Sequence, residues 1–192
     1  MRTIAANANK PSPNKSSAPA KTIGDIVSHR HNPAFFESDY VKVILPLLQE
    51  TDMGAAGVLD EHGHLSGLLT ERAILRHIFA RSADKLVHPA NVKKYIDDML
   101  VDEVMIAEPE ALDDDLSIED AAAMMLRRGY RYMPVVSRFD RKRLLGIVSE
   151  RELALQLQQK LEEVKRSESQ HKSMLSYMLH EPYGCGYPPE SA

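Results

Sequence analysis

Two short segments of the chain carry the same chemical pattern, in which a hydroxyl side chain precedes a glutamate and an arginine. Residues 67–72 read Gly-Leu-Leu-Thr-Glu-Arg, and residues 146–151 read Gly-Ile-Val-Ser-Glu-Arg. Each follows a short apolar run and opens an amphipathic stretch, which predicts a strand that ends at the hydroxyl and a helix that follows it. Because backbone N–H groups at a helix start attract anions, a hydroxyl at that point favours binding of a phosphate group.

The two segments belong to a longer internal repeat. Gly67 and Gly146 lie 79 residues apart, and the apolar positions of 41–59 align with those of 118–136 at a spacing of 77. The two-residue difference falls in the polar segments 60–66 and 137–145, which are typical of tight turns between strands. Each unit therefore reads strand, helix, strand, turn, strand, helix.

The expected elements follow from this pattern. In the first unit we expect a lead-in strand or turn at Ile23–Val27, a helix to Glu50 that contains Pro46, strands at 54–59 and 65–69, and a helix at 71–79. A linker with a short helix at 92–100 follows. In the second unit we expect a lead-in at 101–105, a helix that the acidic run Asp113–Asp115 begins and Gly129 ends, strands at 133–136 and 144–148, and a helix of about thirty residues from Glu150.

Composition excludes several classes of protein. The net charge of −4 over 192 residues argues against bulk binding to nucleic acid. The single cysteine, Cys185, excludes an intrachain disulfide bond and favours a reducing compartment. No apolar run is long enough for a membrane helix and no signal-peptide core is visible, so we predict a cytoplasmic protein.

On these residues the chain resembles a tandem pair of cystathionine-beta-synthase (CBS) domains, also called a Bateman module. The resemblance covers about residues 21–157 and rests on the two hexamers and on Tyr-Met-Pro-Val-Val at 132–136. It implies an α+β fold with two β-α-β-β-α units packed as a pseudo-two-fold pair, plus a long C-terminal helix. The predicted organisation is a disordered basic tail (1–20), the first unit (21–81), a linker (82–99), the second unit (100–157), a helical extension (158–180) and a flexible tail (181–192). An organelle transit peptide is the alternative interpretation of the basic tail.

The resemblance also implies a ligand site in a cleft between the units. An adenosine-containing nucleotide (AMP, ADP, ATP, NAD or S-adenosylmethionine) would place its phosphate at the hydroxyl and its ribose at a carboxylate three residues later. Ser149 and Glu152 supply both groups, although the family pattern has Asp at the second position. Thr70 is followed by Ala73, so a second site with Thr70 and Leu68 is expected to be weaker. By the same resemblance, the remaining walls of the Ser149 site are Ile147, Arg131, Tyr132, Thr22, Asp25, Val27, Met53, Gly54 and Ala55.

These residues predict a regulatory sensor module rather than an enzyme. No Gly-x-Ser-x-Gly elbow, P-loop or dinucleotide fingerprint is present. We expect no required cofactor and no metal site, because the pairs His29/His31 and His62/His64 lack further nearby ligands. A homodimer and a client protein are the predicted partners, and the alternative function is a ligand-free dimeric scaffold.

The long C-terminal helix leaves two interpretations open. Its apolar residues follow a 4-3 spacing that Glu168 interrupts: Leu157, Leu161, Val164, His171, Leu175 and Met178. Such a stripe either pairs with a partner helix or folds back on its own domain.

Overall fold

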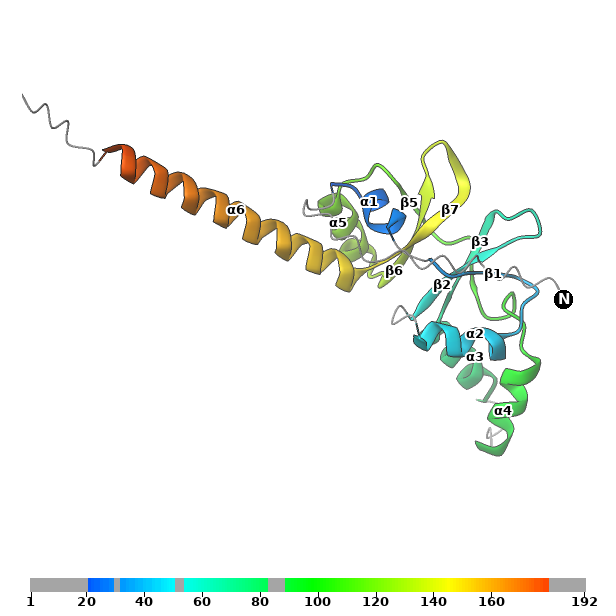
Figure 1. Cartoon of the computed structure of the whole chain (residues 1–192). Coiled ribbons are helices and arrows are strands. Elements are labelled where there is room, and N and C mark those ends of the chain that lie inside the picture. Colours follow the sequence, from blue (N-terminus) through cyan, green and yellow to red (C-terminus); the bar gives the residue numbers. More distant parts are fainter. Residues whose placement is uncertain (1–20, 30–31, 51–53, 83–88, 180–192) are drawn as a thin grey trace, which may run out of the picture.

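The computed structural model describes residues 21–29, 32–50, 54–82 and 89–179 of the chain. The predictions made for the two tails, for Met53 and for His31 lie outside these residues. Two β-sheets face each other in the middle of the body, with helices on their outer sides and one long helix that projects away from them (Figure 1). The predicted α+β class, with two tandem units and a long C-terminal helix, is confirmed.

The first sheet has the strand order β1-β2-β3-β4. Strand β1 (Ala34–Phe36) runs parallel to β2 (Ala55–Leu59), and β2 forms a hairpin with β3 (Leu65–Thr70). Helices α2 (Val41–Glu50) and α3 (Glu71–Ser82) belong to this half, and α4 (Pro89–Asp98) leads toward the second half. Pro46 lies inside α2, as the sequence predicts.

The second sheet has the order β5-β6-β7. Strand β5 (Leu112–Asp113) is parallel to β6 (Tyr132–Ser137), which pairs antiparallel with β7 (Asp140–Ser149). Helix α5 (Ile118–Arg128) ends at Gly129, whose φ of 70° is the left-handed conformation expected of a C-terminal glycine cap. The predicted 30-residue helix is α6 (Glu150–Leu179).

The units exchange their first segments. Residues 23–27 form a helix, α1 (Ile23–Ser28), so the predicted lead-in strand or turn is wrong. The capping box of Thr22 and Asp25 explains the helix, because it satisfies N–H groups at the helix start. The apolar face of α1 packs into the core of the second unit, beside residues of β6, β7 and α5. Conversely, Met99, Val101 and Val104 pack into the core of the first unit.

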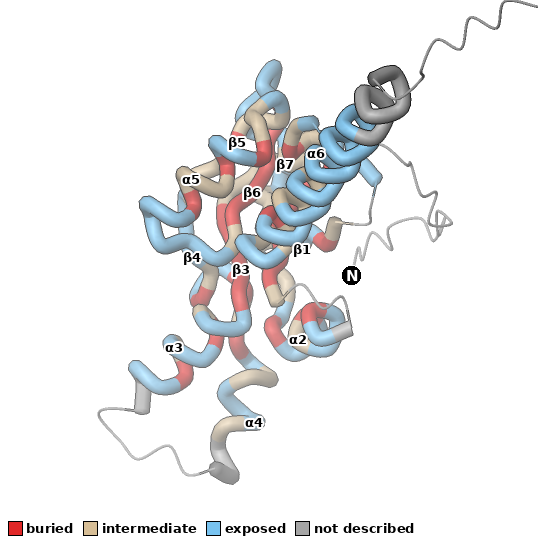
Figure 2. The backbone as a smooth tube through the Cα atoms, turned by 90° about the vertical axis from the view of Figure 1, so that its left-hand side faces the viewer, coloured by how far each residue is buried: buried red, intermediate tan, exposed pale blue. Residues whose placement is uncertain are grey.

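The same exchange completes the first sheet. Strand β4 (Ile106–Ala107) belongs to the second unit in sequence, yet it pairs with Gly67 and Leu68 of β3 in the first unit. A buried contact of Ala55, Leu68 and Ile147 joins the two sheets, with Tyr132 packed against it. The buried residues therefore run through both sheets as one body, as Figure 2 shows.

The acidic run does not begin α5. Ser117 caps that helix and accepts the N–H of Asp120, whereas Asp113 lies in β5. Asp114 and Asp115 bind the backbone and the guanidinium of Arg138 in the turn between β6 and β7. The acidic run therefore stabilises the β6–β7 hairpin and does not interact with the dipole of α5. Among the described residues, no helix is both long and apolar enough to cross a membrane.

Candidate functional site

The two hydroxyl groups of the repeat occupy equivalent positions. Thr70 ends β3 and accepts the N–H of Ala73 at 3.0 Å, while Ser149 ends β7 and accepts the N–H of Glu152 at 3.2 Å. Each oxygen therefore caps the helix that follows it. The hydroxyl proton is the group that each residue can donate to a ligand oxygen.

The backbone around these caps is also repeated. The N–H of Glu71 donates to the carbonyl of Gly54 at 3.2 Å, and the N–H of Glu150 donates to the carbonyl of Arg131 at 2.9 Å. Gly54 and Arg131 thus stand at matching positions, just before the first strand of each hairpin. The local geometry that the hexamers predict is present in both units.

A hollow of about 520 Å³ opens beside Thr70, between the two units. This volume lies within the usual range of small-molecule sites, about 300–1,000 Å³. The first unit contributes the residue before β2, the end of β3 and the start of α3, and the second contributes the segment before β5 and the start of β6 with the residues before it. The residues that line the hollow include Gly54, Leu68, Thr70, Glu71, Arg72, Arg76, Ile106, Glu108, Glu110, Arg131, Tyr132 and Met133.

Charged side chains of both signs line the hollow. Arg72 and Arg76 come from successive turns of α3, and Arg131 comes from the opposite unit. Guanidinium groups are planar donors that match phosphate oxygens. Glu108 and Glu71 offer carboxylate acceptors of the kind that bind vicinal hydroxyls.

An apolar surface lies next to these charges. Leu68, Tyr132, Met133 and Ile106 line the same hollow, and Leu68 and Tyr132 belong to the apolar contact between the sheets. A flat apolar base fits such a surface, while its polar substituents reach the charged rim. The hollow therefore combines phosphate-binding, hydroxyl-binding and base-binding chemistry.

The structure distributes the predicted site residues over several places. Arg131, Tyr132 and Gly54, which the sequence assigns to the Ser149 site, line the hollow together with Thr70 and Leu68. Ala55 and Ile147 are buried in the contact between the sheets.

The three predicted residues of α1 have structural contacts. Thr22 and Asp25 cap the helix, and Val27 belongs to the core of the second unit. The N–H groups of Thr22 and Lys21 donate to the Asp25 carboxylate and hold its pKa below the usual value.

Ser149 and Glu152 lie where β7 joins α6. Ser149 and Glu152 are half-buried at the root of α6. Met53, which the sequence assigns to this site, lies outside the described residues. The assignment of Ser149 and Glu152 to a ligand stays a prediction.

Sequence reasoning missed the wall formed by residues 106–110. Ile106 belongs to β4, which pairs with the sheet of the first unit, and Glu108 has a positive φ of 47°. Glu110 lies 3.4 Å from the guanidinium of Arg128. The repeat contained the relevant information, because the lead-in segment of one unit can also pair with the sheet of the other unit.

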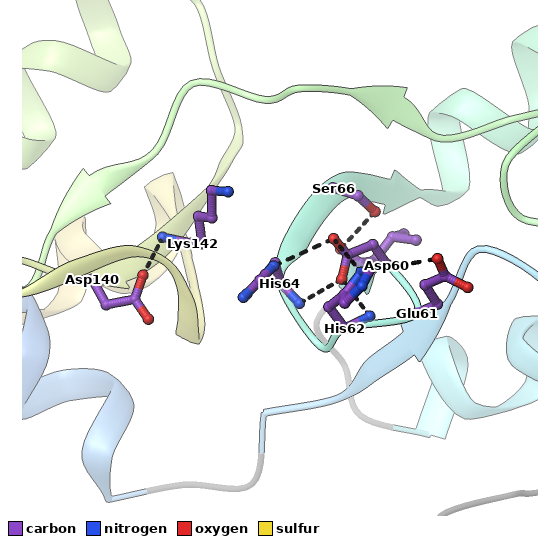
Figure 3. A network of polar contacts seen from close by, with 8 residues as sticks. Asp60, Glu61, His62, His64, Ser66, Asp140 and Lys142 are labelled. Atoms are coloured by element: carbon purple, nitrogen blue, oxygen red, sulfur yellow. Dashed lines mark hydrogen bonds and ion pairs between the residues drawn. The ribbon is translucent and has the colours of Figure 1, made fainter.

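The histidine pair of the first hairpin is part of the turn between its strands. One carboxylate oxygen of Asp60 accepts the N–H groups of His62 and His64, at 2.9 and 2.8 Å (Figure 3). These bonds, with that of His64 as the larger contribution, lower the pKa of Asp60. Asp140 accepts the N–H of Lys142 in the second hairpin in the same way. Within the described parts of the chain, no group of three or more His, Cys, Asp or Glu side chains can hold a metal ion.

Comparison with known proteins agrees with this architecture. The sequence model of the CBS domain matches residues 23–80 and 101–158. The chain is 29% identical over 107 residues to an uncharacterized 17.7 kDa protein in the bps2 3′ region of Acidianus ambivalens, and the match spans 56% of each protein.

Two solved structures illustrate the likeness of fold. One is CBSX2 in complex with AMP, at 24% identity and a TM-score of 0.56, covering 73% of this chain and 98% of that one. The other is the CBS domain pair of protein MJ0100 in complex with 5-methylthioadenosine and S-adenosyl-L-methionine, at 17% identity and a TM-score of 0.55, covering 74% and 99%. At these identities the likeness establishes the fold.

Proposed function

The chain belongs to the CBS-domain family, and from that premise we propose that it is a regulatory module that binds an adenosine-containing nucleotide in the hollow beside Thr70. The observation that carries this proposal is the meeting of Thr70 with Arg131 and Tyr132, which come from different units, around one hollow. A ligand held there contacts both units at once. Solved relatives of the same fold contain AMP or S-adenosyl-L-methionine, which supports the class of ligand.

Each part of the ligand has candidate contacts. The phosphate would accept hydrogen bonds from the Thr70 hydroxyl and from the guanidinium groups of Arg72 and Arg131. The carboxylate missing at Ala73 would be replaced by that of Glu108 or Glu71, which line the same hollow. The base would lie against Leu68 and Tyr132.

The residues around Ser149 repeat part of the Thr70 arrangement. Ser149 caps α6 as Thr70 caps α3, and Glu152 stands three residues later. We therefore propose Ser149 and Glu152 as the core of a second ligand site.

The signal would pass through the backbone of Arg131. Arg131 lines the hollow, and its carbonyl accepts the N–H of Glu150, the first residue of α6. A ligand that draws the Arg131 guanidinium inward acts directly on the root of this helix. Such an effect requires unequal affinity of the ligand for two arrangements of the units.

The test is calorimetric titration of the purified chain with AMP, ADP, ATP, NAD and S-adenosylmethionine, followed by thermal unfolding with each ligand. A ligand at about 100 times its Kd should stabilise the fold by about 2.7 kcal/mol. Arg131→Gln should weaken binding by about tenfold or more. Arg127→Gln is the matched control, because Arg127 is an exposed residue at the end of α5.

Two results would overturn the proposal. Absence of binding for every nucleotide at millimolar concentration favours the alternative function, a ligand-free scaffold. Equal losses in Arg131→Gln and Arg127→Gln would place the ligand outside the hollow beside Thr70.

A further inference from the structure

Helix α6 has a packed root and an exposed arm. Leu153 is fully buried and Leu157 packs against the core of the second unit. The last anchor on the body is Lys160, whose ammonium group forms an ion pair with Glu119 of α5. Residues 161–172 are all exposed, and the arm extends away from the body in Figures 1 and 2.

The arm carries an apolar stripe without a partner in the described part of the chain. Leu161 is 62% exposed and Val164 is 49% exposed. The 4-3 spacing continues through Glu168 and His171, and the sequence places Leu175 and Met178 at the next two positions. A helical arm of this length is marginally stable in water by itself, so packing of the stripe against a second helix would stabilise it.

Charge decides the orientation of a second copy. In a parallel pair, equivalent residues of the stripe face each other. Glu168 would then meet Glu168, and His171 would meet His171. Lys160 and Lys165, which flank the stripe five residues apart, would also face each other. Parallel self-pairing therefore sets Glu168 against Glu168 and Lys160 against Lys165.

The antiparallel arrangement does not set Glu168 opposite Glu168. We propose that two copies of the chain pair through antiparallel α6 arms, with the two-fold axis between Glu168 and His171. Glu168 of each copy then faces His171 of the other. In this register Val164 is placed opposite Leu175, and Leu161 opposite Met178.

The register is self-complementary because all three pairs have the same midpoint. The interface is therefore isologous, as a closed dimer requires. In this register Lys165 of one copy lies near Lys172 of the other along one edge of the pair, and the Glu168 carboxylates lie among these ammonium groups. The central polar pair fixes the register, which the apolar residues alone would leave free to slip.

Charge exchange tests both the interface and its direction. The mass of the full-length chain, 21.6 kDa as a monomer, is measured by light scattering from about 1 to 100 μM. We expect the wild type to reach twice this mass. Glu168→Lys and His171→Glu should each raise the dimer Kd by more than about tenfold, because the first removes the carboxylate that faces His171 and the second sets two carboxylates together.

The double substitution Glu168→Lys/His171→Glu separates the two directions. In the antiparallel register it restores opposite charges and should return the Kd to near the wild-type value. In a parallel pair it would leave like charges together in both layers. Glu163→Lys is the matched control, with the same change of charge at an exposed residue one position before the stripe residue Val164.

Leu161→Asp should also dissociate the dimer, and circular dichroism checks that the body stays folded, since Leu161 lies outside the core. A monomeric wild type at 100 μM would overturn the proposal and favour a different protein as the partner of α6. A dimer that none of the stripe substitutions weakens, or a double variant no tighter than the single ones, would overturn it as well.

Discussion

Gly54 lies against the phenol of Tyr132, so closely that a Cβ atom on Gly54 would come within 2.8 Å of the Tyr132 oxygen. Gly54 precedes β2 in the first unit and Tyr132 begins β6 in the second, so the contact joins the units at the edge of the hollow. Gly54 also has a φ of 62°, which a side chain disfavours. Two independent constraints therefore require glycine at this position.

Gly54→Ala should destabilise the fold and weaken nucleotide binding. The positive φ costs about 1 kcal/mol, and the clash with Tyr132 adds to it by moving the phenol. The control is Gly63→Ala, because Gly63 has a φ of 80° and a Cβ atom there would meet no neighbouring side chain or backbone within 4 Å. Urea unfolding should show a larger loss for Gly54→Ala than for Gly63→Ala. Equal losses would mean that the contact with Tyr132 has no energetic role.

Thr70→Ala and Ser149→Ala should distinguish binding at the two proposed sites. Both remove a helix cap of the same geometry, so each should cost about 1 kcal/mol of stability. Calorimetric titration should show a loss of affinity of about tenfold in Thr70→Ala, since its hydroxyl lines the hollow. Loss of affinity in Ser149→Ala alone would move the primary site to the other cleft. Loss of one binding event in each variant would establish two sites.

Ile23→Ala should destabilise the second unit, although residue 23 belongs to the first unit in sequence. The side chain is fully buried beside residues of α5, β6 and β7, and such truncations cost about 2–5 kcal/mol. Leu126→Ala is the control, because Leu126 is 67% exposed on α5. Hydrogen exchange should show faster exchange in β6 and β7 for Ile23→Ala. Protection of these strands at the wild-type level would contradict the exchange of segments.

Lys160→Gln should raise the pKa of Glu119. The hydrogen bond from the Lys160 ammonium lowers this pKa, so the pair stabilises the fold above the ordinary pKa of glutamate. The contribution is lost as the pH falls through the lowered pKa of the folded state. Both side chains are partly exposed, so we expect less than about 1 kcal/mol.

Carbon-detected NMR titration of the Glu119 carboxyl measures this shift. Lys165→Gln is the matched control, since Lys165 lies on the exposed arm of α6. The titration of Glu119 should be unchanged in that variant. A pKa of Glu119 that stays low in Lys160→Gln would show that the ion pair is not its cause.

The sequence by itself determined the local parts of the molecule. The paired hexamers predicted two strands that end in hydroxyl caps, and Thr70 and Ser149 accept the expected N–H groups. Gly129 predicted the end of α5, and the amphipathic stretch after Ser149 predicted α6. These features depend on neighbours within a few residues, so periodicity and capping chemistry suffice to find them.

Only the tertiary structure decided which segments meet. Ile23 packs against residues about ninety positions later, and β4 joins the sheet of the preceding unit. Both units carry the same local pattern, so the local sequence does not decide which lead-in segment packs against which sheet. Burial of apolar surface selected the exchanged arrangement, and this selection placed Arg131 and Tyr132 beside Thr70. A site built from two units depends on contacts between distant residues, which no local spacing encodes.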